Sequence, residues 1–218
     1  MTVWDELKVV LVRLRDEQPR ALQGYPMPEV DEGRYPPFSI LLAAWATAVA
    51  EDLHRQFGDD VDLTVGALPY PPGRQPPPQP AGGEPTALLD PQEIAADLDG
   101  PAIVKSGESV GHGLLLTNVT GQDIEIETNG HVTADVVDPS TGEMIGGSSG
   151  PQLLPLIVFR IEPGQTQRIP LLIGTDSITP RLGYTVPAGK WGLQVILTLS
   201  RHDPASRRTP ILPLTITA

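Results

Sequence analysis

The four histidines of the chain are the first side chains to consider for acid–base or metal chemistry. His54, His112, His131 and His202 are far apart in the sequence, and no two have the spacing of a metal-binding pair. His54 falls near the polar side of a predicted helix, and the other three lie in or near predicted turns. We interpret all four as solvated surface side chains rather than as metal ligands or general bases.

Carboxylates gather in the segment DVVDPSTGE, around one predicted hairpin. Asp135, Asp138 and Glu143 offer oxygen atoms, but Ca²⁺ takes about 6–8 oxygen ligands. An Asp-Pro turn, in which the aspartate caps its own backbone, explains the same residues without an ion. A solvated helix face and helix end likewise explain a second acidic group: Glu51, Asp52, Asp59 and Asp60.

Nucleophiles and cofactor-binding loops are missing from the sequence. The chain has no cysteine, which excludes disulfides, thiolate nucleophiles and zinc–thiolate sites. The serines of GGSSG at 146–150 lack the strand-to-helix elbow of a hydrolase nucleophile. No glycine-rich run follows a strand and opens a helix, as phosphate and dinucleotide sites require. The sequence therefore predicts a protein that is not an enzyme and binds neither a cofactor nor a metal.

The charge balance restricts the partners. Lys and Arg number 15 against 27 Asp and Glu, which gives a formal net charge of −12 in 218 residues. Such a chain repels phosphates, so we expect no binding to nucleic acid or to an anionic membrane. The N-terminus carries Asp5 and Glu6 where a signal peptide would be basic and then apolar. The apolar run 40–50 is shorter than the ~20 residues that cross a bilayer. We expect a soluble, cytoplasmic protein.

The N-terminal 68 residues predict a small unit of two helices and one strand. An apolar stripe through Trp4, Leu7, Leu11 and Leu14 indicates a helix over 3–17. A second helix is expected to begin near Ser39, which would be its N-cap. Its apolar stripe would comprise Leu41, Trp45, Ala48, Val49, Leu53 and Phe57. A short strand follows, in which Val61, Leu63 and Val65 alternate with polar residues.

A proline-rich segment separates this unit from the rest of the chain. The stretch PYPPGRQPPPQPAGGEP at 69–85 contains eight prolines, which cannot donate to a sheet ladder or occupy a helix interior. We interpret residues 69–90 as an extended linker; a ligand for an SH3-like groove is the alternative. The predicted domains are therefore 1–68, a linker at 69–90, and 91–218.

Residues 91–218 have the pattern of an all-β domain. About seven or eight short strands, separated by turn signals, predict an immunoglobulin-like antiparallel β-sandwich, so that the whole chain is of the α+β class. Pro187 and Gly189 form a turn that leads into a strand with Leu193, Val195 and Leu197 on one face. Trp191 shares that face and is expected to pack over the end of the sandwich. The sequon NVT at Asn118 is interpreted as a strand end and turn.

The order of these turns resembles the BsuPI family, the intracellular proteinase inhibitor domain of bacilli. The resemblance covers about residues 110–199. Three positions depart from the family pattern: Trp191 replaces a tyrosine-type aromatic, Gln165 replaces a frequent Glu, and the hairpin at 138–142 is one residue longer. The matching turn residues are Asn118, Asp138, Gly142, Pro163, Gly164, Pro187, Gly189 and Trp191. The resemblance implies an immunoglobulin-like sandwich and, as an activity, protease inhibition.

Two functions are consistent with the sequence. The first is a non-catalytic protein-binding or accessory module, and the alternative is an intracellular protease inhibitor that presents a loop or a sheet edge. Because a unit of two helices and one strand buries its apolar faces poorly, residues 1–66 are expected to bind a protein partner or a second copy. The candidate contact residues are Trp4, Leu41, Trp45, Val61, Leu63, Val65 and Trp191.

Overall fold

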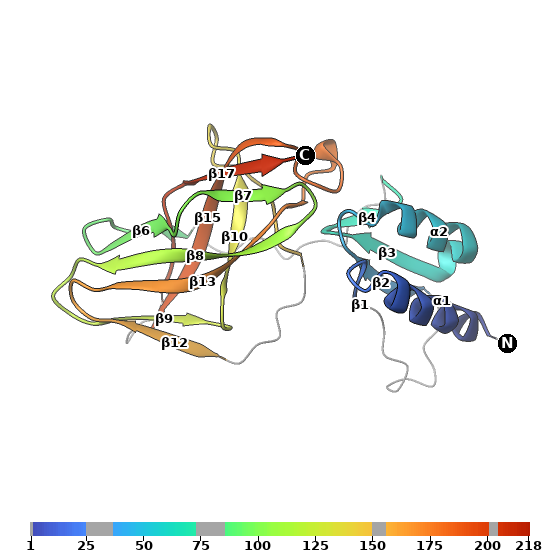
Figure 1. Cartoon of the computed structure of the whole chain (residues 1–218), viewed down its shortest axis with the longest axis horizontal. Helices are drawn as coiled ribbons and strands as arrows, with labels where there is room; N and C mark the ends of the chain where they lie inside the picture. Colours follow the sequence, from blue (N-terminus) through green and yellow to red (C-terminus); the bar gives the residue numbers. More distant parts are fainter. Residues whose placement is uncertain (1, 25–36, 73–85, 150–155, 201–204) are drawn as a thin grey trace.

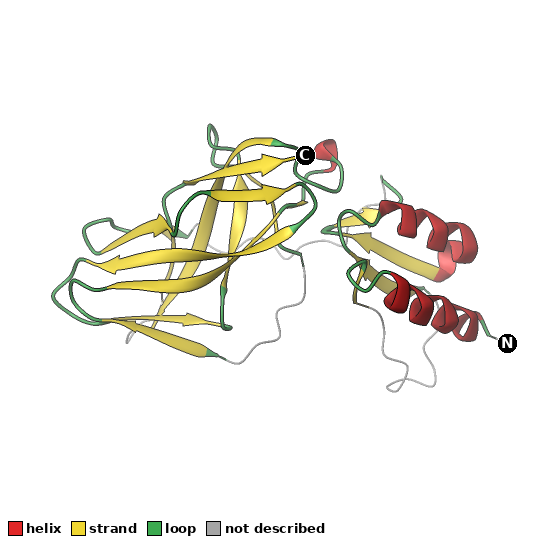
Figure 2. Cartoon of the chain, in the orientation of Figure 1, coloured by secondary structure: helices red, strands yellow, loops and turns green. Residues whose placement is uncertain are grey.

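The structure, a computed structural model, describes residues 2–24, 37–72, 86–149, 156–200 and 205–218. These residues form mostly β-strands together with two α-helices (Figures 1 and 2). Two separate hydrophobic cores divide them into a smaller unit, residues 2–72, and a β-unit, residues 86–218. Within the described residues, no helix is long and apolar enough to span a membrane.

The first helix of the smaller unit, α1, spans Val3–Glu17, as the apolar stripe predicts. It begins with a reciprocal cap: Asp5 N donates to Thr2 Oγ1 over 3.2 Å, and Thr2 N donates to the Asp5 carboxylate over 2.9 Å. Leu7, Leu11 and Leu14 are buried, and they hold α1 against the core.

A four-stranded sheet provides the other side of this core. β2 and β3 run parallel and are joined through helix α2, while both helices lie on the same side of the sheet (Figure 2). In both β2 and β3, alternate residues are buried, which is the pattern of strands with one covered face. The elements are β1 (Leu22–Gly24), β2 (Phe38–Leu42), α2 (Thr47–Phe57), the 3₁₀ turn η1 (Gly58–Asp60), β3 (Val61–Val65) and β4 (Leu68–Tyr70), with sheet order β1-β2-β3-β4.

Two predictions for this unit are wrong. The second helix does not begin near Ser39, because Phe38–Leu42 is a strand paired along its length with β3, and Trp45 precedes α2. The predicted strand at Val61–Val65 is confirmed, but it is not the single strand of the unit, because β2 and β4 flank it on its two sides. Outside the undescribed residues 25–36, the unit contains four strands instead of the one predicted, and these strands supply the apolar cover that the helices alone lack.

In its described residues the β-unit contains thirteen strands, more than the seven or eight predicted. Several of the additional strands have only two to four residues and carry little sequence signal. The strands are β5 (Ala87–Leu88), β6 (Ile94–Leu98), β7 (Ala102–Lys105), β8 (Ser109–Asn118), β9 (Ile124–Thr128), β10 (Val132–Val137), β11 (Met144–Gly147), β12 (Ile157–Ile161), β13 (Thr166–Gly174), β14 (Asp176–Ser177), β15 (Gly189–Ser200), β16 (Ala205–Arg208) and β17 (Leu212–Thr217), with a 3₁₀ turn η2 (Pro180–Leu182) after β14.

The long strand β15 connects strands β10 and β17 to strands β9 and β16. Its first half pairs with β10 and β17, and its second half pairs with β9 and β16. Leu193, Val195 and Leu197 are buried, so the predicted alternation of this strand is confirmed, and Trp191 packs against the same core. The pairing is not purely antiparallel as predicted, because β10–β13, β5–β16 and β7–β17 are parallel.

The two units contact each other through the segment between η2 and β15. Tyr184, from the β-unit, packs against the hydrophobic core of the smaller unit and donates a hydrogen bond from its hydroxyl to Pro69 O over 3.3 Å. Most of the proline-rich segment lies outside the described residues. Of its described ends, Pro69 and Tyr70 belong to β4, whereas Ala87 and Leu88 form β5 and pair with β16.

Candidate protein-binding edge strand

Strand β12 lies at one edge of the β-unit sheet. It pairs antiparallel with β9 from Ile157 opposite Thr128 to Ile161 opposite Ile124, and no other described strand pairs with it. Figure 1 shows it at the lower margin of the β-unit. Half of its backbone N–H and C=O groups therefore point away from the sheet, where another chain can pair with them.

The side chains along this edge are apolar and exposed. Leu156, just before the strand, is 65% exposed, Ile157 is 40% exposed and Val158 is 48% exposed. The register places Ile157 and Phe159 on the face that covers the core, since their partners on β9, Thr128 and Ile126, are buried there. Phe159 packs against the core but remains partly exposed. An added strand could therefore extend both the ladder and the core.

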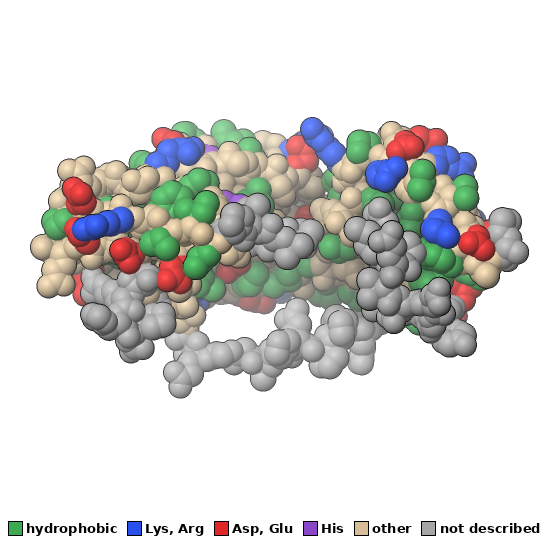
Figure 3. All heavy atoms as spheres, turned by 90° about the horizontal axis from the view of Figure 1, so that it is seen from below, with side chains coloured by type: hydrophobic (Ala, Val, Ile, Leu, Met, Phe, Trp, Pro, Cys, Tyr) green, Lys and Arg blue, Asp and Glu red, His purple; other side chains and the backbone are tan. Residues whose placement is uncertain are grey.

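On the outer face of β12, the charges are mainly negative. Val158 lies opposite Glu127 and Arg160 opposite Glu125. Arg160 donates from Nε and Nη2 to the Asp123 carboxylate, with an Nε–Oδ2 distance of 2.9 Å. This bonding raises the pKa of Arg160, and the charges of nearby carboxylates add to the shift. Figure 3 views the molecule from below the orientation of Figure 1, and in this view apolar and charged side chains intermingle over the β-unit.

A polar pocket of about 280 Å³ lies at the C-terminal end of β12. The turn between β12 and β13 forms part of it, and Gly164 in this turn has a positive φ of 73° that favours glycine. The turn that the sequence predicts at Pro163 and Gly164 is thus confirmed. The residues that line the pocket are Arg160, Ile161, Glu162, Gln165, Thr166 and Gln167.

Asn118 holds this end of the edge strand in place. Its side chain is fully buried, and Nδ2 donates to Ile161 O over 2.9 Å and to Gln122 O over 2.7 Å. Its Oδ1 accepts hydrogen bonds from the backbone N and the hydroxyl of Thr120. The sequence identified Asn118 as a strand end, which is confirmed. Its role as a link between two turns depends on contacts 43 residues apart and has no local signal.

A second hollow lies between the two units. It has a volume of about 710 Å³, and both cationic and anionic side chains line it. Trp45, one of the predicted contact residues, is 45% exposed at its wall. The charged, amide and aromatic residues that line it are Arg20, Gln23, Trp45, Lys105, Glu108 and Asp176.

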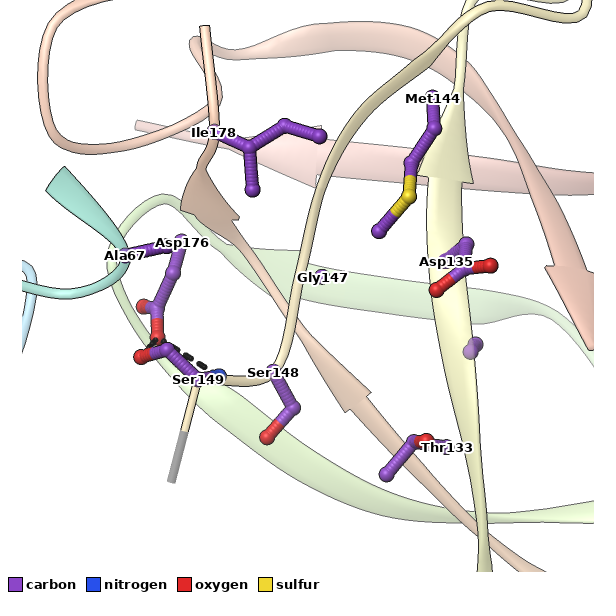
Figure 4. Close-up of a pocket in the computed structure, with 10 residues that line it drawn as sticks. Ala67, Thr133, Asp135, Met144, Gly147, Ser148, Ser149, Asp176 and Ile178 are labelled. Atoms are coloured by element: carbon purple, nitrogen blue, oxygen red, sulfur yellow. Dashed lines mark hydrogen bonds between the residues drawn. The ribbon is translucent and has the colours of Figure 1, made fainter. Parts of the chain in front are cut away.

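Two carboxylates flank a much smaller pocket of about 60 Å³ (Figure 4). Burial raises the pKa of both Asp135 and Asp176, and Asp176 accepts hydrogen bonds from the backbone N and the hydroxyl of Ser149. Figure 4 shows the two aspartates on opposite sides, with Ser148 between them. The volume suits a few water molecules rather than a substrate. Among the described residues, no group of three or more His, Cys, Asp or Glu side chains is arranged to hold a metal ion.

The residues predicted as partner contacts do not form one surface. Val61, Leu63 and Val65 are fully buried in the core of the smaller unit, because β3 is the interior strand between β2 and β4. Trp4 is half-buried and lies 5.0 Å from Phe38, ring centroid to ring centroid. Leu41 is half-buried on β2, Trp45 is exposed between the units, and Trp191 is half-buried on β15.

The polar residues singled out in the sequence also remain dispersed. The predicted Asp-Pro turn is confirmed, since Asp138 accepts hydrogen bonds from the backbone N and the hydroxyl of Ser140 over 2.8 and 2.6 Å. His54 lies edge-on to Tyr70, His112 contacts Gly113 O, and His131 is half-buried. His202 lies outside the described residues.

No protein-family model and no curated protein matches the chain, so the resemblance to the BsuPI family is not confirmed. Solved structures with some likeness include a PapD-like domain of human CEP192, with 12% identity and a TM-score of 0.28 over 65% of this chain and 98% of that one. The sporulation control protein Spo0M of Bacillus subtilis has 15% identity and a TM-score of 0.28 over 58% and 49%. The CooA pilin subunit of enterotoxigenic Escherichia coli has 11% identity and a TM-score of 0.26 over 56% and 99%. At these scores the likenesses define neither a family nor a function.

Proposed function

We propose that this chain is a non-catalytic protein-binding module, and that β12 binds an extended segment of a partner as an additional strand. The observation that carries the proposal is an edge strand with exposed apolar side chains, whose open side pairs with no other strand in the part of the chain that the structure describes. Main-chain hydrogen bonds provide affinity in such complexes, and alternate side chains provide specificity.

The contrast with other edges of the same sheet supports this choice. Strand edges that avoid association are commonly short or carry charged residues. Edge strand β6 contains the exposed Asp97, and β7 ends with the exposed Lys105. On β12 the single charge belongs to Arg160, which Asp123 neutralises. β12 is therefore the edge with the least protection against pairing among these three.

A displayed library of random twelve-residue peptides, selected on the purified full-length protein, tests the proposal. We expect selected peptides whose affinity falls at least about tenfold on Ile157→Lys, because a charge that points toward the core at a sheet edge opposes strand addition. Ile103→Lys is the matched control, since Ile103 is 58% exposed on edge strand β7. Circular dichroism establishes that both variants are folded. Selected peptides that bind the two variants equally well, or a selection that yields none, would contradict the proposal.

Protease inhibition is the second candidate, and an exposed turn favours it. Residues 187–190 are exposed, and Trp191 Nε1 donates to Pro187 O over 2.8 Å, which fixes the turn at the start of β15. A protease inhibitor that presents a loop binds more tightly when the loop is rigid, because less conformational freedom is lost on binding. Titration of subtilisin-like and trypsin-like serine proteases tests it: an inhibitor would abolish activity at a defined stoichiometry, and Lys190→Ala would weaken it.

We also propose that the chain divides into domains at 1–68 and 91–218, with a linker at 69–90. The two separate hydrophobic cores support this division. The described ends of the linker extend β4 by two residues on one side and supply β5 on the other. The β-unit alone would then carry the binding edge, and the smaller unit would orient it.

A further inference from the structure

We infer that the segment which adds to β12 alternates apolar residues with Lys or Arg, the apolar residues facing the core and the basic residues facing outward. This inference rests on the proposed function and specifies the chemistry of the partner. The two faces of β12 impose different requirements on an incoming strand, and each follows from the observed register.

The inner face requires apolar side chains. Directly opposite residues of neighbouring strands share a face, with Cβ atoms about 5 Å apart. An added strand would place alternate side chains beside Ile157 and Phe159, which lie at the margin of the core and are incompletely covered. Polar groups in these positions would lose water without gaining partners, which is unfavourable.

The outer face favours positive charge. Arg160 is held by Asp123, which immediately precedes β9, so its guanidinium is directed back across β9 and away from the open edge. Asp123 and Glu125 on that side, together with Glu162 beyond the strand, bring three carboxylates to this one guanidinium. Glu127 adds a fourth carboxylate opposite Val158. Among the described residues here, four carboxylates therefore surround one guanidinium, which leaves negative charge for the partner to balance.

The pocket at the end of β12 gives a long basic side chain a place to bind. Glu162 lines it together with the side chains of Gln165, Thr166 and Gln167, which provide hydrogen-bond acceptors. Arg160 also lines it, but its guanidinium is paired with the Asp123 carboxylate. A volume of about 280 Å³ is ample for one Lys or Arg side chain. A basic residue next to Ile161 on the added strand would reach this pocket, so the end of the strand provides selectivity in addition to the ladder.

The same charges argue against a second copy of the chain as the occupant. Antiparallel pairing of two β12 strands would leave the acidic residues around Glu125 and Glu162 of each chain without basic partners from the other chain. Each chain also carries a formal net charge of −12, and like charges across an interface oppose association. A basic segment of another protein relieves this repulsion, whereas a second copy increases it.

Three synthetic ten-residue peptides test the inference, with full-length protein and fluorescence anisotropy as the readout. The first alternates Val and Lys, the second alternates Val and Glu, and the third is the Val–Lys peptide with alternate backbone nitrogens methylated. We expect the Val–Lys peptide to bind at least about tenfold more tightly than the other two, because only it offers both the ladder and the charge. Its affinity should fall with increasing salt.

A pair of double variants separates local charge from net charge. Glu125→Gln/Glu162→Gln should weaken binding of the Val–Lys peptide by about fivefold, as expected for two solvent-exposed ion pairs. Glu6→Gln/Glu17→Gln removes the same net charge from α1, and it should leave the affinity unchanged.

The outcomes distinguish this inference from the proposed function. Equal binding of the Val–Lys and Val–Glu peptides, both abolished by Ile157→Lys, would overturn the basic preference and leave strand addition standing. Equal effects of the two double variants would likewise overturn it, because only net charge would matter. If sedimentation shows a dimer that Ile157→Lys converts to a monomer, the occupant is a second copy and the inference fails. Binding of the methylated peptide as tightly as the unmethylated one would overturn strand addition itself.

Discussion

Tyr184 of the β-unit lies against Tyr70 of the smaller unit, with their ring centroids 6.2 Å apart. Burial raises the pKa of Tyr184, and Tyr70 adds to the shift, so this phenol is partly shielded from water where the units meet. Because Tyr184 packs on one hydrophobic core while its chain neighbours belong to the other, it is one of the contacts that couple the two units.

Replacement of this ring is expected to uncouple the units. Tyr184→Ala removes an aromatic pair worth about 0.5–1.5 kcal/mol beyond its buried area. We expect calorimetry to show the smaller unit unfolding at a lower temperature while the transition of the β-unit stays in place. Tyr184→Phe, which keeps the ring and loses only the hydrogen bond to Pro69 O, should lie close to the wild type. A single unshifted transition for Tyr184→Ala would show that other contacts couple the units.

Asn118 provides a second prediction, because four hydrogen bonds converge on one buried side chain. Asn118→Ala leaves the carbonyls of Gln122 and Ile161 without these donors, at a cost of about 1–3 kcal/mol for each buried group that stays unpaired. Asn118→Asp keeps the shape but places acceptors against two carbonyl oxygens, so it should destabilise the protein as well. Urea denaturation measures both effects.

The position of Asn118 beside the end of β12 allows a second measurement, of local opening. Because Asn118 bonds to the last residue of β12, its loss should loosen the edge strand before the rest of the sheet. Hydrogen exchange of β12 amides should therefore quicken more in Asn118→Ala than exchange of β13 amides. Equal acceleration in the two strands would mean that Asn118 stabilises the sheet as a whole and does not fix this edge.

The sequence correctly predicted the elements that have a regular hydrophobic period and a local start signal. It did not predict the elements whose secondary structure is determined by pairing between distant segments. Helix α1 has both an apolar stripe and a cap, and its predicted range 3–17 is confirmed. The run FSILLAAW has apolar residues at both helical and alternate spacing, and its parallel pairing with β3, some twenty residues later, makes its first part a strand. Residues 157–161 could be predicted as a strand but not as an edge, since edge position depends on which strands lie beside it.

The cap of α1 yields a prediction about pH. Hydrogen bonds from Thr2, with Lys8 contributing, lower the pKa of Asp5 to about 2 from its ordinary 3.8. A lowered native pKa means that the ionised carboxylate stabilises the fold above pH 3.8, and that this contribution is lost as the pH falls toward 2. Carboxyl NMR titration should give a midpoint near 2 for Asp5 in the wild type. In Thr2→Ala the midpoint should move toward 3.8, and an unchanged midpoint would contradict the assigned cause.

Asp176 should show the opposite pH dependence. It is 5% exposed, and burial raises its pKa while the two hydrogen bonds from Ser149 only partly offset the effect. The native state therefore binds this proton more tightly than the unfolded state does. Below pH 3.8, Asp176 is protonated in both the native and the unfolded state, so its burial does not lower the free energy of unfolding. As the pH rises from 3.8 through the native pKa, the free energy of unfolding falls, and this loss is complete above the native pKa.

Asp176→Asn should consequently be more stable than the wild type at pH 7, since Asn Oδ1 can still accept from Ser149 and carries no charge into the protein interior. The advantage should shrink as the pH falls toward 3.8, which urea denaturation at a series of pH values will measure.

Asp138→Asn is the matched control, with an effect of the opposite sign. Hydrogen bonds from Ser140 lower the pKa of Asp138, so this variant should be less stable than the wild type at pH 7. Its deficit should disappear at acid pH, below the native pKa of Asp138. If Asp176→Asn instead destabilises the protein at neutral pH, the surroundings of Asp176 favour its ionised form, which would contradict burial as the dominant effect on its pKa.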